Sequence, residues 1–241
     1  MVNTIEAKHL CKNYDGVKAI DSISFEIKRG EVFGLLGANA AGKSTTIECI
    51  LGTRKADGGK ASILGLDPRR ERKALFKRVG VQFQESSYQE KITVGELCEE
   101  TASLYKKAAD FRTLLSRFGL SEKLKSPVGE LSGGQKQRLF IVLALIPEPE
   151  VVFLDELTTG LDAKARREVW KCLTELKEKG MTILLTSHFM DEVEALCDRI
   201  MILKKGNCVF CGTVSEAIAA SGCEKFEDAY LKLADDEEER V

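Results

Sequence analysis

Hydrophobic and polar residues alternate in two stretches near the N-terminus, residues 4–10 and 22–27. These stretches flank a polar turn that contains Tyr14 and Gly16. A period of two residues is typical of β-strands with one buried face. The pattern therefore predicts a β-hairpin, or two strands of an antiparallel layer, at the start of the chain.

Short, largely apolar runs at residues 32–36, 151–154 and 181–185 predict further strands, and residues 60–65 and 79–84 predict two more. The run at 151–154 contains no polar residue, as expected of a strand that is covered on both faces of a parallel sheet. Residues 200–203 and 208–210 flank a turn at Gly206, which predicts a late hairpin.

Between residues 86 and 126 the spacing becomes helical, with Leu, Val, Ala and Phe recurring at helical intervals over 94–107 and 110–118. This stretch predicts a helical insertion that leads into a helix over residues 136–146. Other helices are predicted over residues 69–78, 163–179 and 226–233. The predicted fold class is α/β, with a mainly parallel sheet, an antiparallel β layer and an inserted helical subdomain.

A chain of 241 residues that is 44% hydrophobic can bury one core, or one core with a small inserted lobe. We predict one domain over residues 1–241. Residues 1–85 and 147–220 form its core with the antiparallel layer, and residues 86–146 form the helical subdomain. Residues 221–241 form a short helix and an acidic tail.

The composition argues against several classes of protein. A net charge of −2 gives no general electrostatic attraction for nucleic acid, so no nucleic-acid partner is expected. The longest apolar run, residues 139–146, is far shorter than the ~20 residues of a membrane span. The first residues lack the pattern of a secretory signal, which favours the cytoplasm.

The eight cysteines favour reduced, buried side chains over a disulfide framework in a chain of this size. Cys208 and Cys211 have the spacing of half a metal site. No second pair or His follows them, so a hairpin strand is the favoured interpretation.

A glycine-edged loop joins the strand at 32–36 to a predicted helix start. It consists of Gly37, Ala38, Asn39, Ala40, Ala41, Gly42, Lys43 and Ser44, with Thr45 following. The glycines let the backbone turn its N–H groups inward, and the helix adds the positive end of its dipole. Lys43 can then reach terminal phosphates and the Ser44 hydroxyl can hold Mg²⁺. The loop predicts a nucleotide triphosphate site.

A second helix start follows the helical insertion, at Ser132, Gly133, Gly134 and Gln135. The two glycines leave the helix N-terminus open and Ser132 can cap it, which favours a second anion-binding position. The alternative is a simple interruption between two helices.

Polar residues end three of the predicted strands: Gln84, the pair Asp155 and Glu156, and His188. The carboxyl ends of parallel strands carry function in such sheets, so these residues are candidates for one site. Adjacent carboxylates on a strand point to opposite sides, so one can reach a metal while the other faces an attacking water. His188 can bridge a γ-phosphate to Glu156.

These residues together resemble the ATP-binding subunits of ABC transporters, which have a RecA-like P-loop NTPase fold. The resemblance covers residues 4–233. It identifies residues 37–44 with the Walker A loop, 131–135 with the signature motif, 151–155 with Walker B, Gln84 with the Q-loop, Leu161 and Asp162 with the D-loop, and His188 with the switch histidine. Tyr14 matches the aromatic that stacks on adenine, although ordinary packing is its alternative role.

The resemblance implies ATP and Mg²⁺ as cofactors. The implied catalytic residues are Lys43, Gln84, Glu156 and His188, and the implied metal ligands are Ser44, Gln84 and Asp155. The implied nucleotide-binding residues are Tyr14, Gly37, Asn39, Ala40, Ala41, Gly42, Lys43, Ser44, Thr45, Ser132, Gly133, Gly134 and Gln135.

Three residues depart from the family pattern. Ala38 and Leu157 stand where the family usually has Pro, and Ala40 stands where it usually has Gly. If position 40 requires a positive φ, an Ala there costs about 1 kcal/mol of strain.

The implied function is that of an ATPase motor subunit. It pairs head to tail with a second copy, or with a homologous ATP-binding subunit, and drives a separate integral membrane permease. It therefore lies on the cytoplasmic face of the cell membrane. The strand at 79–85, the late hairpin and residues 226–230 resemble ABC-2 type multidrug and antibiotic exporters. The alternative is a soluble, non-transport ABC ATPase that acts in assembly or repair.

Overall fold

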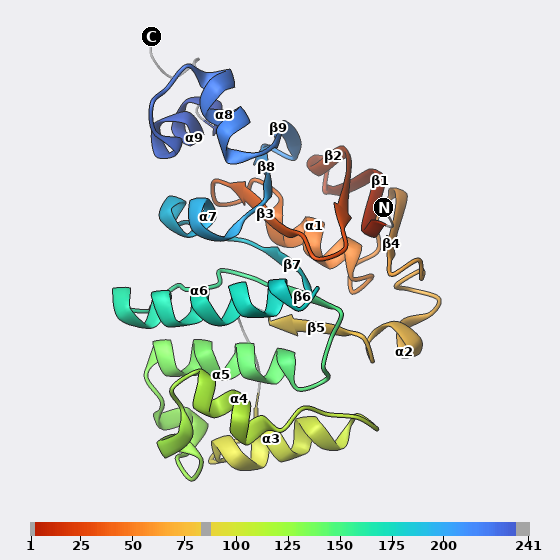
Figure 1. The fold of residues 1–241 in the computed structure, drawn as a ribbon. Coiled ribbons are helices and arrows are strands. Elements are labelled where there is room, and N and C mark those ends of the chain that lie inside the picture. Colours follow the sequence, from red (N-terminus) through yellow and green to blue (C-terminus); the bar gives the residue numbers. More distant parts are fainter. Residues whose placement is uncertain (1–2, 83–87, 235–241) are drawn as a thin grey trace.

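A six-stranded sheet runs through the molecule, in the order β5-β6-β7-β3-β8-β9 (Figure 1). The computed structural model describes residues 3–82 and 88–234. The first five strands are parallel, and β9 pairs antiparallel with β8. The mainly parallel sheet and the late hairpin are therefore confirmed. The strands are β3 Val32–Gly37, β5 Val79–Gln82, β6 Val151–Leu154, β7 Thr182–Leu185, β8 Arg199–Lys204 and β9 Asn207–Gly212.

A second sheet, in the order β2-β1-β4, is antiparallel and confirms the predicted hairpin. Its strands are β1 Asn3–Tyr14, β2 Val17–Lys28 and β4 Gly58–Ile63. β1 and β2 are longer than the alternating stretches that predicted them. Register shifts interrupt their pairing, and His9 and Ser22 have positive φ values of 52° and 56° near these shifts. Such irregularities break the period of two, so a pattern search ends each strand too early.

The two faces of the six-stranded sheet are covered by different elements. In β6, Val152 and Leu154 belong to a core shared with α5 (Gly133–Leu145) and α6 (Ala163–Glu178). Val151 and Phe153 belong to a core shared with α1 (Lys43–Ile50) and the antiparallel sheet. All of β6 is buried, as its apolar sequence predicts.

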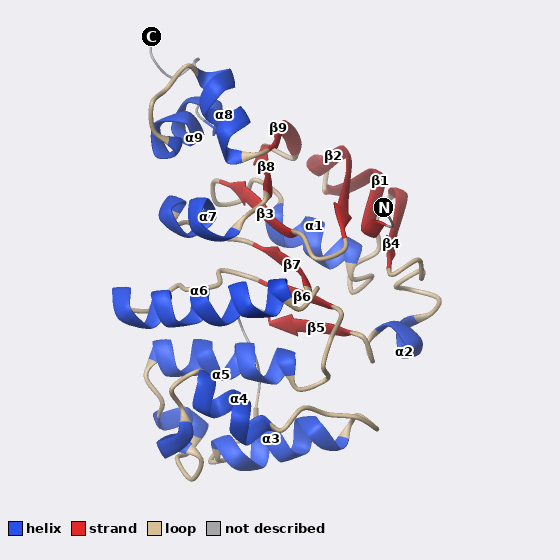
Figure 2. Cartoon of the chain, in the orientation of Figure 1, coloured by secondary structure: helices blue, strands red, loops and turns tan. Residues whose placement is uncertain are grey.

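The helices α3 (Val94–Ser103), α4 (Phe111–Arg117) and α5 gather at one end of the molecule (Figure 2). Short 3₁₀ turns at Ser121–Lys123 and Val128–Glu130 connect α4 to α5. α5 approaches β5 closely, since a Cβ on Gly80 would lie 2.0 Å from the carbonyl oxygen of Ala144. The close approach joins these helices to the sheet through one continuous core.

Two predicted helices are shorter than expected. The basic stretch 69–78 forms only α2, Arg72–Leu75. The Asp67 carboxylate accepts hydrogen bonds from the N–H groups of Arg69 and Arg70 at 2.8 and 3.2 Å, which holds the chain in a turn before α2. α3 ends at Ser103, not at residue 107.

The C-terminal part, as far as the structure describes it, contains three short helices. Two were not predicted, α7 (Met190–Leu196) and α8 (Val214–Ser221), and one was, α9 (Phe226–Ala234). Phe226 and Ala229 of α9 pack with Ile200 and Ile202 of β8. Within the described residues, every helix is too short or too polar to cross a bilayer.

Candidate active site

The loop between β3 and α1 is enclosed so closely that its two end positions admit only glycine. Gly37 has φ 149° and Gly42 has φ 106°. A Cβ on Gly37 would lie 2.5 Å from the Leu203 carbonyl oxygen, and one on Gly42 would lie 2.4 Å from that of Ala19. Gly42 precedes α1 without a side-chain cap, so the first N–H groups of the helix stay open to an anion.

Ala40 in this loop has a φ of 63°, which is the left-handed conformation that the family's glycine would adopt without strain. We expect Ala40→Gly to leave ATP affinity unchanged or to tighten it by no more than about fivefold, because it removes about 1 kcal/mol of strain. Titration calorimetry measures this affinity. Ala38→Gly is the matched control, since Ala38 is exposed in the same loop, as Ala40 is, but is not among the residues with positive φ and has no strain to lose. A clear loss of affinity in Ala40→Gly would contradict the expectation.

Lys43 is held against its own loop. Its Nζ donates hydrogen bonds to the carbonyl oxygens of Gly37 at 2.7 Å and Ala38 at 3.0 Å. Burial lowers the pKa of Lys43, and the nearby Asp155 and Glu156 carboxylates oppose that shift. The structure thus places the predicted lysine within electrostatic range of both predicted carboxylates.

Asp155 and Glu156 lie just beyond the end of β6, which ends at Leu154. The prediction that they alternate along a strand is wrong, because the strand has ended and Glu156 has a φ of 49°. Thr186, beyond the end of β7, holds both residues. Its hydroxyl donates to Asp155 Oδ1 at 2.6 Å and accepts from the Glu156 N–H at 2.8 Å. Burial raises the pKa of Asp155, while the Thr186 hydrogen bond and Lys43 act against it.

His188 reaches Glu156 as predicted: its Nε2 lies 3.5 Å from Glu156 Oε1. The two residues follow β7 and β6, which are neighbours in the sheet. Gln84, the remaining strand-end candidate, lies outside the described residues.

The residues present fit a nucleotide-bound Mg²⁺. Ser44, exposed in the first turn of α1, and Asp155 offer hard oxygen ligands, and a magnesium ion bound through phosphates needs only one or two protein ligands. Among the described residues no cluster of three His, Cys, Asp or Glu could hold a metal by itself. All eight cysteines are free thiols.

The second predicted helix start lies at the N-terminus of α5. Ser132 caps the helix: its hydroxyl accepts from the Gln135 N–H at 3.3 Å, and the Gln135 side chain accepts from the Ser132 N–H at 3.0 Å. A Cβ on Gly134 would lie 2.9 Å from a Leu161 methyl group. A Cβ on Gly133 would meet nothing within 4 Å, so the space beside this residue is open.

Comparison with known proteins agrees with this geometry. The family model described as ABC transporter matches residues 20–159, more than half of the chain. This chain belongs to the ABC transporter family, as an ATP-binding domain. A solved structure described as the ATP binding subunit of an ABC transporter superposes on it with a TM-score of 0.88 and 29% identity, covering 96% of this chain and 100% of the other.

Two relatives of this ABC domain carry names connected with export. The probable multidrug ABC transporter ATP-binding protein YbhF of Escherichia coli (strain K12) is 35% identical, over 96% of this chain and 42% of that protein. The Nod factor export ATP-binding protein I of Burkholderia pseudomallei (strain 1710b) is 40% identical, over 94% of this chain and 76% of that protein. The chain therefore spans less than half the length of YbhF.

Tyr14 of this ABC domain ends β1 and is 37% exposed. Lys12 Nζ and the Arg54 guanidinium carbon each lie 5.3 Å from the centre of its ring. Two cations therefore lie over this ring, in the region where a stacking base would also have to lie.

Three polar residues that support the site escaped prediction: Thr186, Gln137 and Glu192. Gln137, on α5, donates from its side-chain Nε2 to the carbonyl oxygens of Glu156 and Leu157. Glu192 of α7 is fully buried and accepts hydrogen bonds from Thr158 and Trp170, both at 2.8 Å. Each acts across a long sequence distance, so no local pattern in the sequence indicates it.

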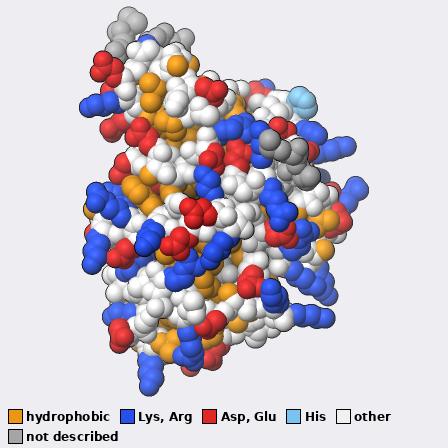
Figure 3. All heavy atoms as spheres, in the orientation of Figure 1, with side chains coloured by type: hydrophobic (Ala, Val, Ile, Leu, Met, Phe, Trp, Pro, Cys, Tyr) orange, Lys and Arg blue, Asp and Glu red, His pale blue; other side chains and the backbone are white. Residues whose placement is uncertain are grey.

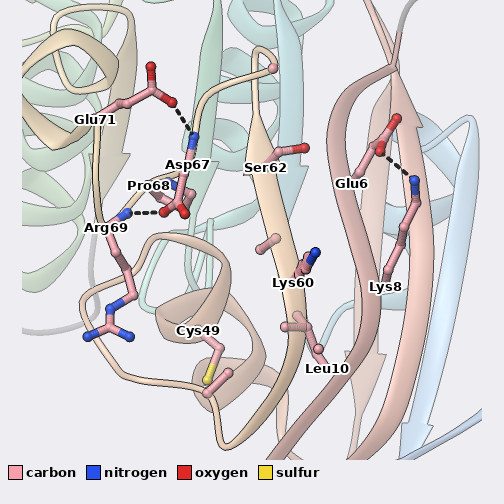
Figure 4. Close-up of a pocket in the computed structure, with 14 residues that line it drawn as sticks. Glu6, Lys8, Leu10, Cys49, Lys60, Ser62, Asp67, Pro68, Arg69 and Glu71 are labelled. Carbon is pink, nitrogen blue, oxygen red and sulfur yellow. Dashed lines mark hydrogen bonds and ion pairs between the residues drawn. The ribbon is translucent and has the colours of Figure 1, made fainter.

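A cavity of about 460 Å³ lies apart from these residues, between the antiparallel sheet and residues 67–71 (Figure 4). Glu6 and Lys8 form an ion pair of 3.0 Å in it. Basic and acidic side chains both line the cavity, and none of the predicted site residues does. It is therefore not part of the candidate active site.

Proposed function

We propose that this chain is the ATP-hydrolysing motor subunit of an ABC exporter, which pairs on ATP and drives a separate membrane permease. The observation that carries the proposal is the grouping of Lys43, Asp155, Glu156 and His188. Asp155 and Glu156 oppose the lowering of the Lys43 pKa by burial, and His188 Nε2 lies 3.5 Å from Glu156 Oε1. Phosphoryl transfer requires a cation that binds phosphate, a hard metal ligand, and a base that a second group orients. Lys43, Asp155, Glu156 and His188 can supply these groups in turn.

Each residue has a distinct task in this proposal. The loop N–H groups and Lys43 bind the phosphates, while Ser44, Asp155 and Gln84 hold Mg²⁺, which neutralises phosphate charge when bound. Glu156 orients or deprotonates the attacking water. His188 holds Glu156 and the γ-phosphate in register. The catalytic effect comes mainly from positioning and charge neutralisation.

The proposed dimer explains why the chain has two anion-binding helix starts. Figure 1 shows α1 and α5 in different parts of the molecule, with β6 and β7 between them. The open space beside Gly133 supports contact with a triphosphate held by the phosphate loop of a second copy or a homologous subunit. Two such contacts form a head-to-tail pair.

The exporter assignment rests on the names of the two relatives and on the resemblance to ABC-2 type exporters. It places the chain in the cytoplasm, against the inner face of the cell membrane, where its permease holds it. Figure 3 shows acidic and basic side chains interspersed over one face, which supports a partner other than nucleic acid.

The permease contact is proposed for the helical lobe, which consists of α3, α4 and α5. Leu104, at the end of α3, is 75% exposed. Two hollows share Thr101 in this region: one of about 440 Å³, which Leu104 also lines, and one of about 290 Å³ between the lobe and β5. Tyr88, Leu97 and Leu104 line the first hollow together, and a grouped apolar surface of this kind supports a contact with another protein.

Affinity purification from solubilised membranes tests the motor-subunit proposal. The tagged chain should bring down a polytopic membrane protein, and Leu104→Asp should reduce its yield several-fold. Leu231→Asp is the matched control, because Leu231 is 49% exposed on α9. Capture of soluble assembly factors in place of a membrane protein would favour the non-transport alternative.

A further inference from the structure

Gln137 connects the signature helix to the turn that carries Glu156. Its side-chain Nε2 donates to the carbonyl oxygen of Glu156 at 2.9 Å and to that of Leu157 at 3.0 Å. Gln137 lies little more than one helical turn after Ser132, the cap of the same helix. One rigid helix therefore carries both the predicted contact to a phosphate and a contact to the catalytic turn.

The Glu156 turn depends on such contacts because its backbone is unusual. A φ of 49° is uncommon for a residue with a side chain. Before Glu156, the Thr186 hydroxyl accepts a hydrogen bond from the Glu156 N–H at 2.8 Å. After it, Gln137 donates to the carbonyl oxygens of Glu156 and Leu157. The peptide groups on both sides of Glu156 are thus held by side chains, and they set the direction in which its carboxylate points.

We propose that Gln137 is a positioning residue that transmits the position of the signature helix to Glu156 of the same chain. This inference rests on the proposed function. In the head-to-tail pair, Ser132 of one copy contacts the triphosphate of the other copy, whereas Glu156 acts on the triphosphate of its own copy. A shift of α5 at one site then moves the carbonyls that orient Glu156 at the other, so Gln137 couples the two sites.

Removing the amide donors tests the coupling. Gln137→Met keeps the length of the side chain but donates no hydrogen bond, and Gln137→Glu is a second variant with acceptors only. For both we expect kcat for ATP to fall about tenfold, with KM changed less than about twofold, because the phosphate loop is untouched. The Hill coefficient for ATP should also fall towards 1.

Arg117→Met is the matched control. Arg117 of α4 donates from its Nη2 to Glu175 Oε2 of α6 at 2.5 Å. This substitution also removes a side-chain hydrogen bond between two elements, but it touches neither the residues proposed to contact ATP nor the Glu156 turn. Its kcat should stay within about twofold of the wild type. Thermal melting of all variants measures any general loss of stability.

A double-mutant cycle separates positioning from a purely structural role. If Gln137 acts through Glu156, then Gln137→Met should change the residual turnover of Glu156→Gln less than about twofold. A full additional loss in that background, an equal loss of kcat in Arg117→Met, or wild-type kcat in Gln137→Met would each overturn the inference. Absence of turnover in the wild type would instead overturn the proposed function.

Discussion

Glu156→Gln should leave ATP binding intact but slow its hydrolysis by about 10²–10³-fold, because an amide cannot accept the proton of the attacking water. The variant should collect in an ATP-bound dimer, since the contacts that close the pair remain and the step that opens it is blocked. ATPase assays give the turnover. Size-exclusion chromatography with light scattering, with and without Mg-ATP, gives the oligomeric state.

Glu148→Gln is the matched control for charge removal. Glu148 precedes β6 at the other end of the strand and forms a surface ion pair with Lys107 at 2.6 Å. Neutralising Glu148 should leave turnover within about twofold of the wild type, because surface ion pairs contribute little to stability. Unchanged turnover in Glu156→Gln would remove Glu156 from the role proposed for it, even if the chain still dimerised.

The sequence predicts the parts of the fold that depend on local pattern. The apolar run at β6 and the alternation around β1 and β2 indicate their strands, because burial on both faces and burial on one face leave different periods. α7 and α8 escaped because they span only 7 and 8 residues, about two helical turns, too few for a period to stand out. Residues 69–78 were overpredicted: Asp67 caps a turn at Arg69 and Arg70, and the helix itself forms only over Arg72–Leu75.

The candidate site likewise combines features that the sequence pattern predicts with features that depend on contacts between distant residues. The approach of His188 to Glu156 could be predicted, since residues that end neighbouring parallel strands meet at one edge of the sheet. The left-handed conformation of Glu156 could not, because it is stabilised by Thr186 and Gln137 from distant parts of the chain. Conversely, the positive φ of Ala40 was anticipated only because a family pattern places glycine there.

Ser132→Arg should separate ATP binding from dimer formation. Among the described residues, the Ser132 side chain bonds only with Gln135 of its own helix, and α5 lies in a different part of the molecule from the phosphate loop (Figure 1). A long side chain at this position would fill the space where the triphosphate of the other copy must lie. ATP affinity of the monomer should therefore change less than about twofold, while turnover falls at least about 100-fold. In the Glu156→Gln background the ATP-dependent dimer should disappear.

Ser132→Ala distinguishes the loss of the helix cap from the blocked phosphate contact. It removes the cap, at a cost of about 1 kcal/mol in stability, but adds no bulk at the helix start. Its dimer should therefore survive in the Glu156→Gln background, with weaker association. If Ser132→Ala abolished the dimer as completely as Ser132→Arg, capping of α5 would account for both effects. If the Ser132→Arg variant dimerised normally, the start of α5 would not face a second triphosphate, and the head-to-tail arrangement would be wrong.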